Sequence, residues 1–220
     1  MHPVLRLYED VLSSAENVEF GLPPLPRFIF VVHGSATIAG EAVNEGEAWQ
    51  GEDAITVKPS PSGVTCWRWE LARGDQGSTT ANAPGMITHE KLSAYLETLP
   101  KGDLLMRGDG VAFPPGGCAY LHRHQGPGIR CLIDGGIRID THGRSTSYGP
   151  GGAWYESGPD AVFAQGSTDK PSRFIRVMVL PRDLHGKSSI QYVNEDDKAK
   201  PKSQTYKIYA DAPIAFAAKK

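Results

Sequence analysis

Short apolar segments bounded by glycine- or proline-containing turns recur along the chain and predict β-strands. Two of them, RFIFVVHGSATI at 27–38 and GIRCLIDGGIRI at 128–139, resemble each other and pair Gly34 with Gly135. GEAW at 46–49 likewise matches GGAW at 151–154, and VTCWRWEL at 64–71 matches RFIRVMVL at 173–180. The order of the matches is kept, and their offset grows only by small insertions. The pattern therefore predicts two tandem copies of one β unit.

One segment between the copies has helical spacing instead. In MITHEKLSAYLETLP, at 86–100, Thr88 can serve as the N-cap and Pro100 can end the helix. The apolar residues three and four positions apart are Leu92, Tyr95, Leu96 and Leu99. This spacing predicts a helix over 87–99 that joins the two units.

The predicted organisation is all-β with this one linking helix. We expect a degenerate N-terminal unit at 15–80, a helical linker at 81–104 and a C-terminal unit at 105–185. An extension at 186–220 contains two strand-like pieces, at 189–193 and 204–210. These pieces would add edge strands to one unit or dock on a partner chain.

Composition and charge limit the fold class and the kinds of partner that the chain can have. The 25 glycines and 17 prolines among 220 residues favour many short strands over a few long helices. The net charge is −2, and the only basic cluster, KAKPK with the final KK, is typical of a solvated tail, so we expect no nucleic-acid partner. No apolar leader or run of membrane-spanning length is present, which predicts a cytoplasmic protein without a membrane partner. The three cysteines lack metal-ligand spacing and are expected to be free thiols.

The chemistry-bearing motif is LHRHQGPG at 121–128. On a strand, residues two apart point to the same side, so His122 and His124 project together. Two imidazoles on one wall can chelate a divalent cation. The alternative is a pair of hydrogen-bonded histidines without metal.

The surrounding residues resemble the cupin superfamily. GGCAYLHRH at 116–124, the later Gly135 and GPGGAWYESGPDAVFA at 149–164 are similar to its two motifs, and the repeat makes the chain similar to a bicupin. The resemblance implies two tandem jelly-roll β-barrels. Two positions depart from it: Gly128 stands where the first motif has a glutamate, and no histidine lies near Val162, where the second motif has a metal ligand.

Glu156 is the candidate that restores a carboxylate. Some cupins with a similar HxHxGP segment carry Trp-x-Glu or Phe-x-Glu at this place and lack the earlier glutamate. Two histidines and one carboxylate with open positions suit non-haem iron, zinc or manganese. We therefore expect one divalent transition metal per chain (Fe, Zn, Mn or Ni) held by His122, His124 and Glu156. The alternative for Glu156 is a solvated carboxylate at a strand end.

Arg130 is the second candidate catalytic group beside Glu156. Strand parity from His124 sends it into the same cavity if the Gly-Pro-Gly segment keeps the register, and its guanidinium could then clamp a substrate carboxylate. A surface arginine is the alternative. The expected pocket residues, which could also be plain core or turn residues, are Tyr120, Gln125, Trp154, Tyr155 and Phe163.

The N-terminal copy lacks this constellation. Its corresponding stretch reads FGLPPLP, and Gly51 takes the place of Glu156. We expect a structural unit that covers the apolar face which a single cupin would bury in a homodimer. The sequence leaves open whether the whole chain itself forms a homodimer.

Two functions from different classes fit these features. The first is a metal-dependent enzyme acting on a small, oxygenated or anionic organic molecule by dioxygenase-, isomerase- or lyase-type chemistry. The second is a small-molecule binding or sensing bicupin without metal.

Overall fold

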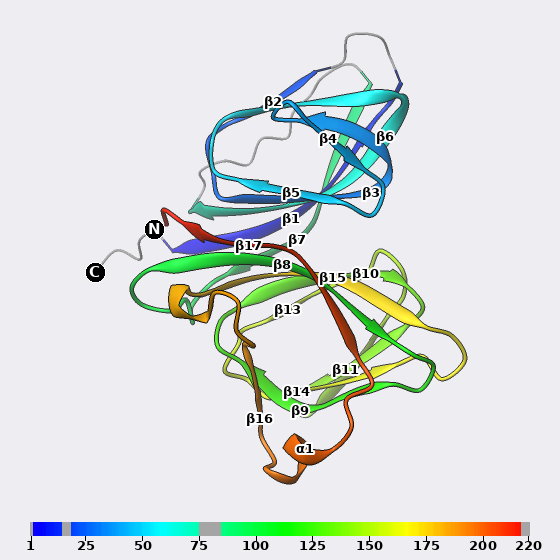
Figure 1. Cartoon of the computed structure of the whole chain (residues 1–220), viewed down its shortest axis with the longest axis vertical. Coiled ribbons are helices and arrows are strands. Elements are labelled where there is room, and N and C mark those ends of the chain that lie inside the picture. The colour runs from blue at the N-terminus through cyan, green and yellow to red at the C-terminus, as the bar shows by residue number, and fades with distance from the viewer. Residues whose placement is uncertain (1, 15–18, 75–84, 217–220) are drawn as a thin grey trace. The chain divides into compact units, whose positions relative to one another are not determined.

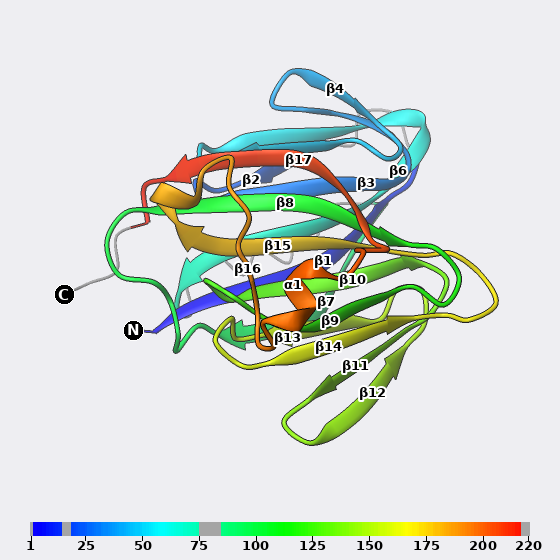
Figure 2. The same cartoon turned by 60° about the horizontal axis from the view of Figure 1, so that its bottom comes forward.

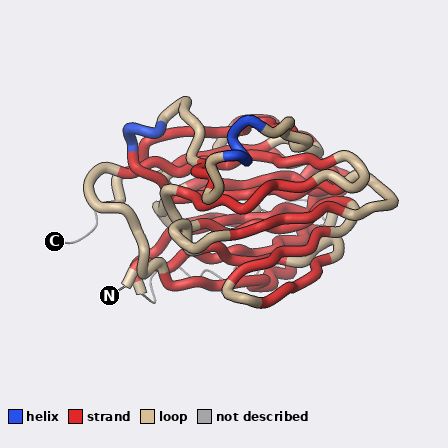
Figure 3. Tube along the Cα trace, turned by 90° about the horizontal axis from the view of Figure 1, so that it is seen from below, coloured by secondary structure: helices blue, strands red, loops and turns tan. Residues whose placement is uncertain are grey.

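The computed structural model describes residues 2–14, 19–74 and 85–216, and it divides the chain into two units, Met1–Leu96 and Glu97–Lys220. The predicted domain boundaries at 15 and 80–81 lie outside the described residues. Strands dominate both units (Figure 3), and the helices of the described part are a 3-10 turn, η1 (Arg182–Leu184), and α1 (Asp196–Ala199). Neither has the length or the apolar character that a membrane-spanning helix needs. The all-β prediction is confirmed.

The N-terminal unit is one seven-stranded antiparallel sheet with the main order β4-β3-β6-β1-β7 (Figure 1). Strands β2 and β5 pair with β6 and β3 off this path. The bounds are β1 (Pro3–Leu12), β2 (Phe20–Leu22), β3 (Arg27–Ile38), β4 (Glu41–Asn44), β5 (Ala48–Gly51), β6 (Ile55–Arg73) and β7 (Met86–Tyr95).

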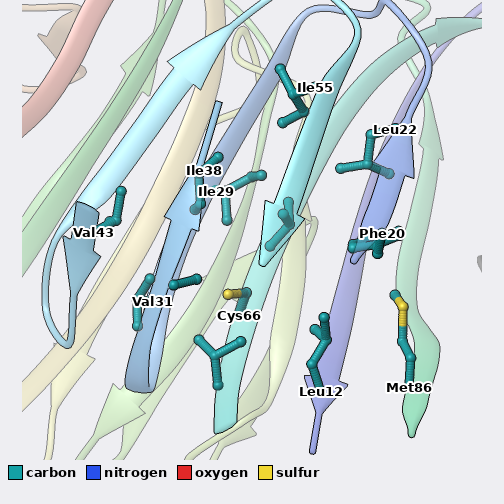
Figure 4. Close-up of a cluster of buried hydrophobic side chains, with 13 residues drawn as sticks. Leu12, Phe20, Leu22, Ile29, Val31, Ile38, Val43, Ile55, Cys66 and Met86 are labelled. Carbon is teal, nitrogen blue, oxygen red and sulfur yellow. The ribbon is translucent and has the colours of Figure 1, made fainter. Parts of the chain in front are cut away.

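An apolar cluster fills one part of this unit's interior (Figure 4). Its side chains come from alternate positions of the strands, as expected when one face of a sheet is buried. Residues two apart, such as Ile29 and Val31 on β3 or Phe20 and Leu22 on β2, share that face. Burial of these side chains is the main favourable contribution to the folding of the unit.

The C-terminal unit consists of two five-stranded antiparallel sheets (Figure 2). Their orders are β13-β10-β15-β8-β17 and β12-β11-β14-β9-β16. The bounds are β8 (Leu104–Phe113), β9 (Cys118–His124), β10 (Gly128–Asp134), β11 (Ile137–Thr141), β12 (Arg144–Tyr148), β13 (Ala153–Glu156), β14 (Val162–Gly166), β15 (Ser172–Pro181), β16 (Ile190–Tyr192) and β17 (Thr205–Ile214). Hydrogen bonding in the described residues does not close either unit into a complete barrel, which corrects the prediction of two barrels.

The strand registers support the internal repeat. Ile29 pairs with Trp49 on one side and Arg68 on the other, and Arg130 pairs in the same way with Trp154 and Arg176. The repeated glycines also have matching roles. Gly34 and Gly135 both have positive φ, and a Cβ on either would lie 2.3 Å from a carbonyl oxygen of a neighbouring segment. Only glycine fits such a position without strain.

The predicted helix over 87–99 is wrong, because Met86–Tyr95 forms β7. This strand pairs antiparallel with β1, and a bulge leaves Lys91 without a cross-strand partner in the register. Met86 and Ala94 are buried, whereas Ile87 and Tyr95 are 69% and 66% exposed. The apolar residues of this segment fit both a helical spacing and the two-residue spacing of a strand. The segment forms a strand because the edge of β1 offers backbone hydrogen bonds along its whole length.

Candidate metal centre

His122 and His124 lie on β9 and project together into the interior of the C-terminal unit. Each is 5% exposed, and their Nε2 atoms lie 3.2 Å apart. A bulge precedes them: Val162 pairs with His122, but Ala164, two residues on, pairs with Ala119. The extra residue in β9 turns Tyr120 out of the inward-facing set. Val162 therefore lies directly opposite His122. The cupin motif has its further metal-binding histidine near this position.

Glu156 is the last residue of β13 and is only 8% exposed, so it is not a solvated strand end. Its cross-strand partner is Gly128, the position where the cupin motif has its glutamate. A Cβ on Gly128 would lie 2.3 Å from the Val177 carbonyl oxygen, which leaves no room for a side chain there. The carboxylate thus comes from the facing residue of the neighbouring strand. Trp154 donates a hydrogen bond of 2.9 Å from Nε1 to Oε1 of Glu156 and fixes its orientation.

These three side chains could hold one metal ion. One ligand atom from each lies within 4.8 Å of the others, and all three residues are buried. Two ligands about 2.1 Å from a common metal ion are themselves about 3 to 3.4 Å apart in tetrahedral or octahedral geometry, close to the 3.2 Å between the two Nε2 atoms. Oε2 of Glu156 faces Nη2 of Arg130 at 2.7 Å. The donor set of two imidazoles and one carboxylate fits a divalent transition metal.

Two arginines flank the group. Arg130 is 1% exposed, which rules out a surface position, and its Nη2 lies 2.7 Å from Oε2 of Glu156. Arg176 donates from Nε and Nη2 to both carboxylate oxygens of Asp109, at 2.8 and 2.7 Å. Its remaining nitrogen, Nη1, lies 3.4 Å from Nε2 of His124. Two cations and two carboxylates thus balance in the interior, and a divalent cation would give the centre an excess of positive charge.

Burial keeps both histidines unprotonated at neutral pH. It is the largest influence lowering the pKa of His122, and the charge of Glu156 opposes it. The pKa of His124 is held well below its usual range, first by burial and then by the charges of Arg176 and Arg130. Metal binding requires the neutral imidazole, so the site is in the correct protonation state without competition from protons near pH 7. Burial also lowers the pKa of Arg130 to about 10.

Each histidine is oriented through its other ring nitrogen. Nδ1 of His122 lies 2.7 Å from the Tyr120 carbonyl oxygen, to which it must donate, so its Nε2 carries a lone pair. Nδ1 of His124 lies 3.3 Å from Oγ of Ser189, which can accept a hydrogen bond from it. Such partners fix the tautomer of a metal-bound histidine.

We expect Ser189→Ala to weaken metal binding about tenfold, because the loss of a partner of this kind costs about 10- to 100-fold in affinity. A competition titration against a chromophoric chelator measures the change. Ser188→Ala, at the neighbouring exposed residue, is the matched control and should bind as the wild type does. Equal affinities for both variants would show that Ser189 does not orient His124.

We expect the metal-free protein to lose stability as the pH falls below about 6.5, the reference value for histidine. Because the folded-state pKa values of His122 and His124 are lowered, the unfolded chain binds more protons below that pH. Each buried histidine contributes up to about 1.4 kcal/mol per pH unit. Urea unfolding over a pH series measures this slope. It should be shallower in His124→Gln and unchanged in His33→Gln, a variant of an exposed histidine.

Two cavities adjoin the centre. The inner one, about 20 Å³, is lined by the three candidate ligands, both arginines and apolar residues including Phe113, Trp154 and Phe174. The outer one, about 220 Å³, shares His124 and Arg176 with it. The inner cavity has room for one water-sized particle.

The predicted pocket residues are distributed over several places. Trp154 lines the inner cavity, and Tyr155 lines a separate cavity beside the β11–β12 hairpin. Tyr120 instead packs with Lys200 and Lys202, whose Nζ atoms lie 5.0 and 5.3 Å from its ring centre. Gln125 and Phe163 are half-buried and line neither cavity of the centre.

Three residues of the centre were missed by the sequence interpretation: Asp109, Arg176 and Ser189. A signal for Arg176 was present, since a charge inside the apolar run FIRVMVL at 174–180 is unusual for a core strand. No comparable signal marked Ser189, which reaches His124 from the C-terminal extension.

The N-terminal unit contains a buried ion-pair network instead of this centre. Arg68 donates to both oxygens of Asp10, at 2.6 and 3.0 Å, and lies 2.7 Å from Glu70. Arg27, also 2.7 Å from Glu70, occupies the register position of Gly128. Gly51 occupies that of Glu156, and a Cβ there would collide with the Trp49 ring at 2.5 Å. The bidentate Arg–Asp pair is common to both units, whereas the candidate ligands occur in one.

Comparison of the structure with solved proteins identifies the fold. AerE from Microcystis aeruginosa aligns with a TM-score of 0.59 and 11% identity over 82% of this chain and 89% of its own. An oxalate decarboxylase from Lactobacillus farciminis, solved as a formate complex, gives 0.60 and 11% over 91% and 82%. A variant of the Bacillus subtilis oxalate decarboxylase gives 0.58 and 12% over 89% and 73%. No protein-family model and no curated protein matches the sequence. The chain has a cupin fold, as its motifs predicted.

Proposed function

We propose that the protein is a metal-dependent enzyme that acts on a small anionic organic molecule in its C-terminal unit. The observation that carries the proposal is the buried His122–His124–Glu156 group, whose ligand atoms lie within 4.8 Å of one another beside two guanidinium groups. A divalent ion held there would act as a Lewis acid that polarises an oxygen of the substrate.

Residues of the chain would bind the substrate, balance the charge of Glu156 and exclude water. Arg176 has one nitrogen, Nη1, directed toward the centre and two engaged by Asp109, so it can hold an anionic group without moving. Arg130 neutralises Glu156 and limits the cost of burying that carboxylate. The apolar walls of the inner cavity exclude bulk water, which strengthens every charge interaction inside it.

Glu156 is the group that we assign as the base, because its carboxylate lines the inner cavity. Its Oε1 accepts a hydrogen bond from Trp154, and its Oε2 lies 2.7 Å from Nη2 of Arg130. A carboxylate in this state can serve as a ligand or accept a proton from a bound molecule. Decarboxylation is the first reaction to test, because two of the structural neighbours are named oxalate decarboxylases; isomerase and dioxygenase chemistry follow.

The experiment is a substrate screen with the metal-loaded protein. Wild type equilibrated with Mn²⁺, Fe²⁺, Zn²⁺ or Ni²⁺ is incubated with oxalate and a panel of 2-oxo and 2-hydroxy acids, and their consumption is followed by NMR. We expect consumption that depends on the metal and disappears in His122→Ala. If carboxylates bind but none is consumed with any metal, the protein is not an enzyme of this class.

The second candidate is a metal-free binding module. The 2.7 Å approach of Arg130 Nη2 to Oε2 of Glu156 favours it, since this ion pair already satisfies the charge that a metal would neutralise. Under this function the purified protein would contain no stoichiometric metal and would bind anions equally well after chelator treatment. A cytoplasmic location and a homodimeric state remain proposals, which fractionation and light scattering test.

A further inference from the structure

The outer cavity differs from the inner one in size and in its walls. It measures about 220 Å³ against about 20 Å³, and four residues line both: His124, Arg176, Ile190 and Tyr206. A molecule larger than a water needs more room at the candidate ligands than the inner cavity has, and the outer cavity is the space that adjoins it at these four residues. The outer cavity then determines which molecules fit.

The C-terminal extension builds much of this outer cavity. Strand β16 pairs with β9 and places Ile190 opposite His124, next to the Ser189 that orients that histidine. Strand β17 pairs with β8 and carries Tyr206 and Ile208 on one face. Arg107 anchors the C-terminal extension to β8. Its guanidinium donates hydrogen bonds to both carboxylate oxygens of Asp211 and to the carbonyl oxygens of Leu184 and Lys187.

The walls of the outer cavity combine apolar and polar side chains. Ile190, Tyr206 and Ile208 supply the apolar surface, and Tyr206 and Ile208 are 50% and 57% exposed. The polar residues of the lining are Arg107, Asp109, Lys187, Ser188 and Ser189. Large apolar side chains that remain this exposed in a cavity gain free energy when a ligand covers them. At the inner end, Arg176 directs Nη1 toward the centre. The cavity therefore suits a molecule with an anionic head and an apolar body.

We propose that the substrate is a carboxylate with a single anionic head and an apolar body, and that Ile190, Tyr206 and Ile208 select it by covering that body. This inference rests on the proposed function, because it places the head at the metal centre. A compact dianion such as oxalate would leave the outer cavity unfilled. The C-terminal extension is thus the part of the chain that determines specificity.

The test is a binding series by isothermal titration calorimetry with zinc-loaded protein, in which the apolar body of the ligand is lengthened. We expect affinity to rise from acetate through butyrate to hexanoate by about fourfold for each buried methylene. Hexanamide, which has the same body without the charge, should bind at least about tenfold more weakly than hexanoate. Equal affinities along the carboxylate series, or no binding of hexanoate, would overturn the inference.

Two variants on β17 test whether the apolar body of the ligand lies against Ile208. Ile208→Asn should reduce the affinity for hexanoate about tenfold or more and leave that for acetate unchanged. Lys207→Asn is the matched control, because Lys207 is exposed, lies next to Ile208 and does not line the cavity; it should bind both ligands as the wild type does. If both variants bind hexanoate equally, the apolar body lies elsewhere and the inference fails.

Failure of the proposed function has a different signature. The same titrations on chelator-treated protein, together with its zinc content, separate the two cases. A chain-length series that persists without zinc and depends on Ile208 supports the apolar cavity and contradicts the metal-dependent enzyme. Stoichiometric zinc with no dependence on chain length supports the metal centre and contradicts the apolar cavity.

Discussion

His124→Ala is expected to lower the affinity of the protein for a divalent transition metal by about 100-fold or more. The variant removes a ligand rather than its orienting partner, whose loss alone costs about 10- to 100-fold. His124 lies between the other two candidate ligands, with its Nε2 3.2 Å from Nε2 of His122 and 3.7 Å from Oε2 of Glu156. Competition with a chromophoric chelator measures the affinity.

The control for this variant is His142→Ala, which changes an exposed histidine of the same unit. It should retain metal as the wild type does. Thermal unfolding of the metal-free proteins checks that His124→Ala still folds, as we expect because the apolar cluster around Phe113, Trp154 and Phe174 stabilises the unit. A folded His124→Ala with wild-type affinity would remove His124 from the ligand set.

Arg68→Met is expected to destabilise the protein by about 3 to 5 kcal/mol, the usual cost of leaving a buried ion pair with one partner. The substitution keeps much of the side-chain volume but leaves Asp10 and Glu70 without the guanidinium that bonds both. Both carboxylates are almost fully buried. Urea unfolding followed by tryptophan fluorescence reports the loss, since Trp67 and Trp69 flank the residue.

Lys58→Met is the matched control, because Lys58 pairs with Glu19 at 3.6 Å on the surface of the same unit. Exposed pairs contribute about 0 to 1 kcal/mol, so this variant should unfold close to the wild type. A small effect of Arg68→Met, comparable to that of Lys58→Met, would mean that the buried network adds little to stability. Metal binding at the other unit should not change in either variant.

The centre could be predicted largely from local pattern. Two-residue alternation places His122 with His124 and Trp154 with Glu156, and the turn at 125–127 keeps the register that directs Arg130 inward. The repeated glycines Gly34 and Gly135 likewise marked equivalent positions of two units. These features depend on neighbours in sequence, which a single chain displays directly.

Other contacts of the centre depend on residues far apart in sequence. Asp109 and Arg176 are 67 positions apart, and Ser189 and His124 are 65 apart. No local pattern specifies such pairs. The segment Met86–Tyr95 shows the same limit, because its apolar residues fit two spacings and the edge of β1 decides between them. The bulge that turns Tyr120 outward also arises only from the pairing of β9 with β14.

The proposed metal centre holds one metal ion per chain at His122, His124 and Glu156. Elemental analysis after equilibration with excess Zn²⁺ and gel filtration tests it most directly, with His122→Ala/His124→Ala prepared in parallel. We expect one zinc per chain in the wild type and almost none in the double variant. A wild type without zinc, or a double variant with the same content, would contradict it.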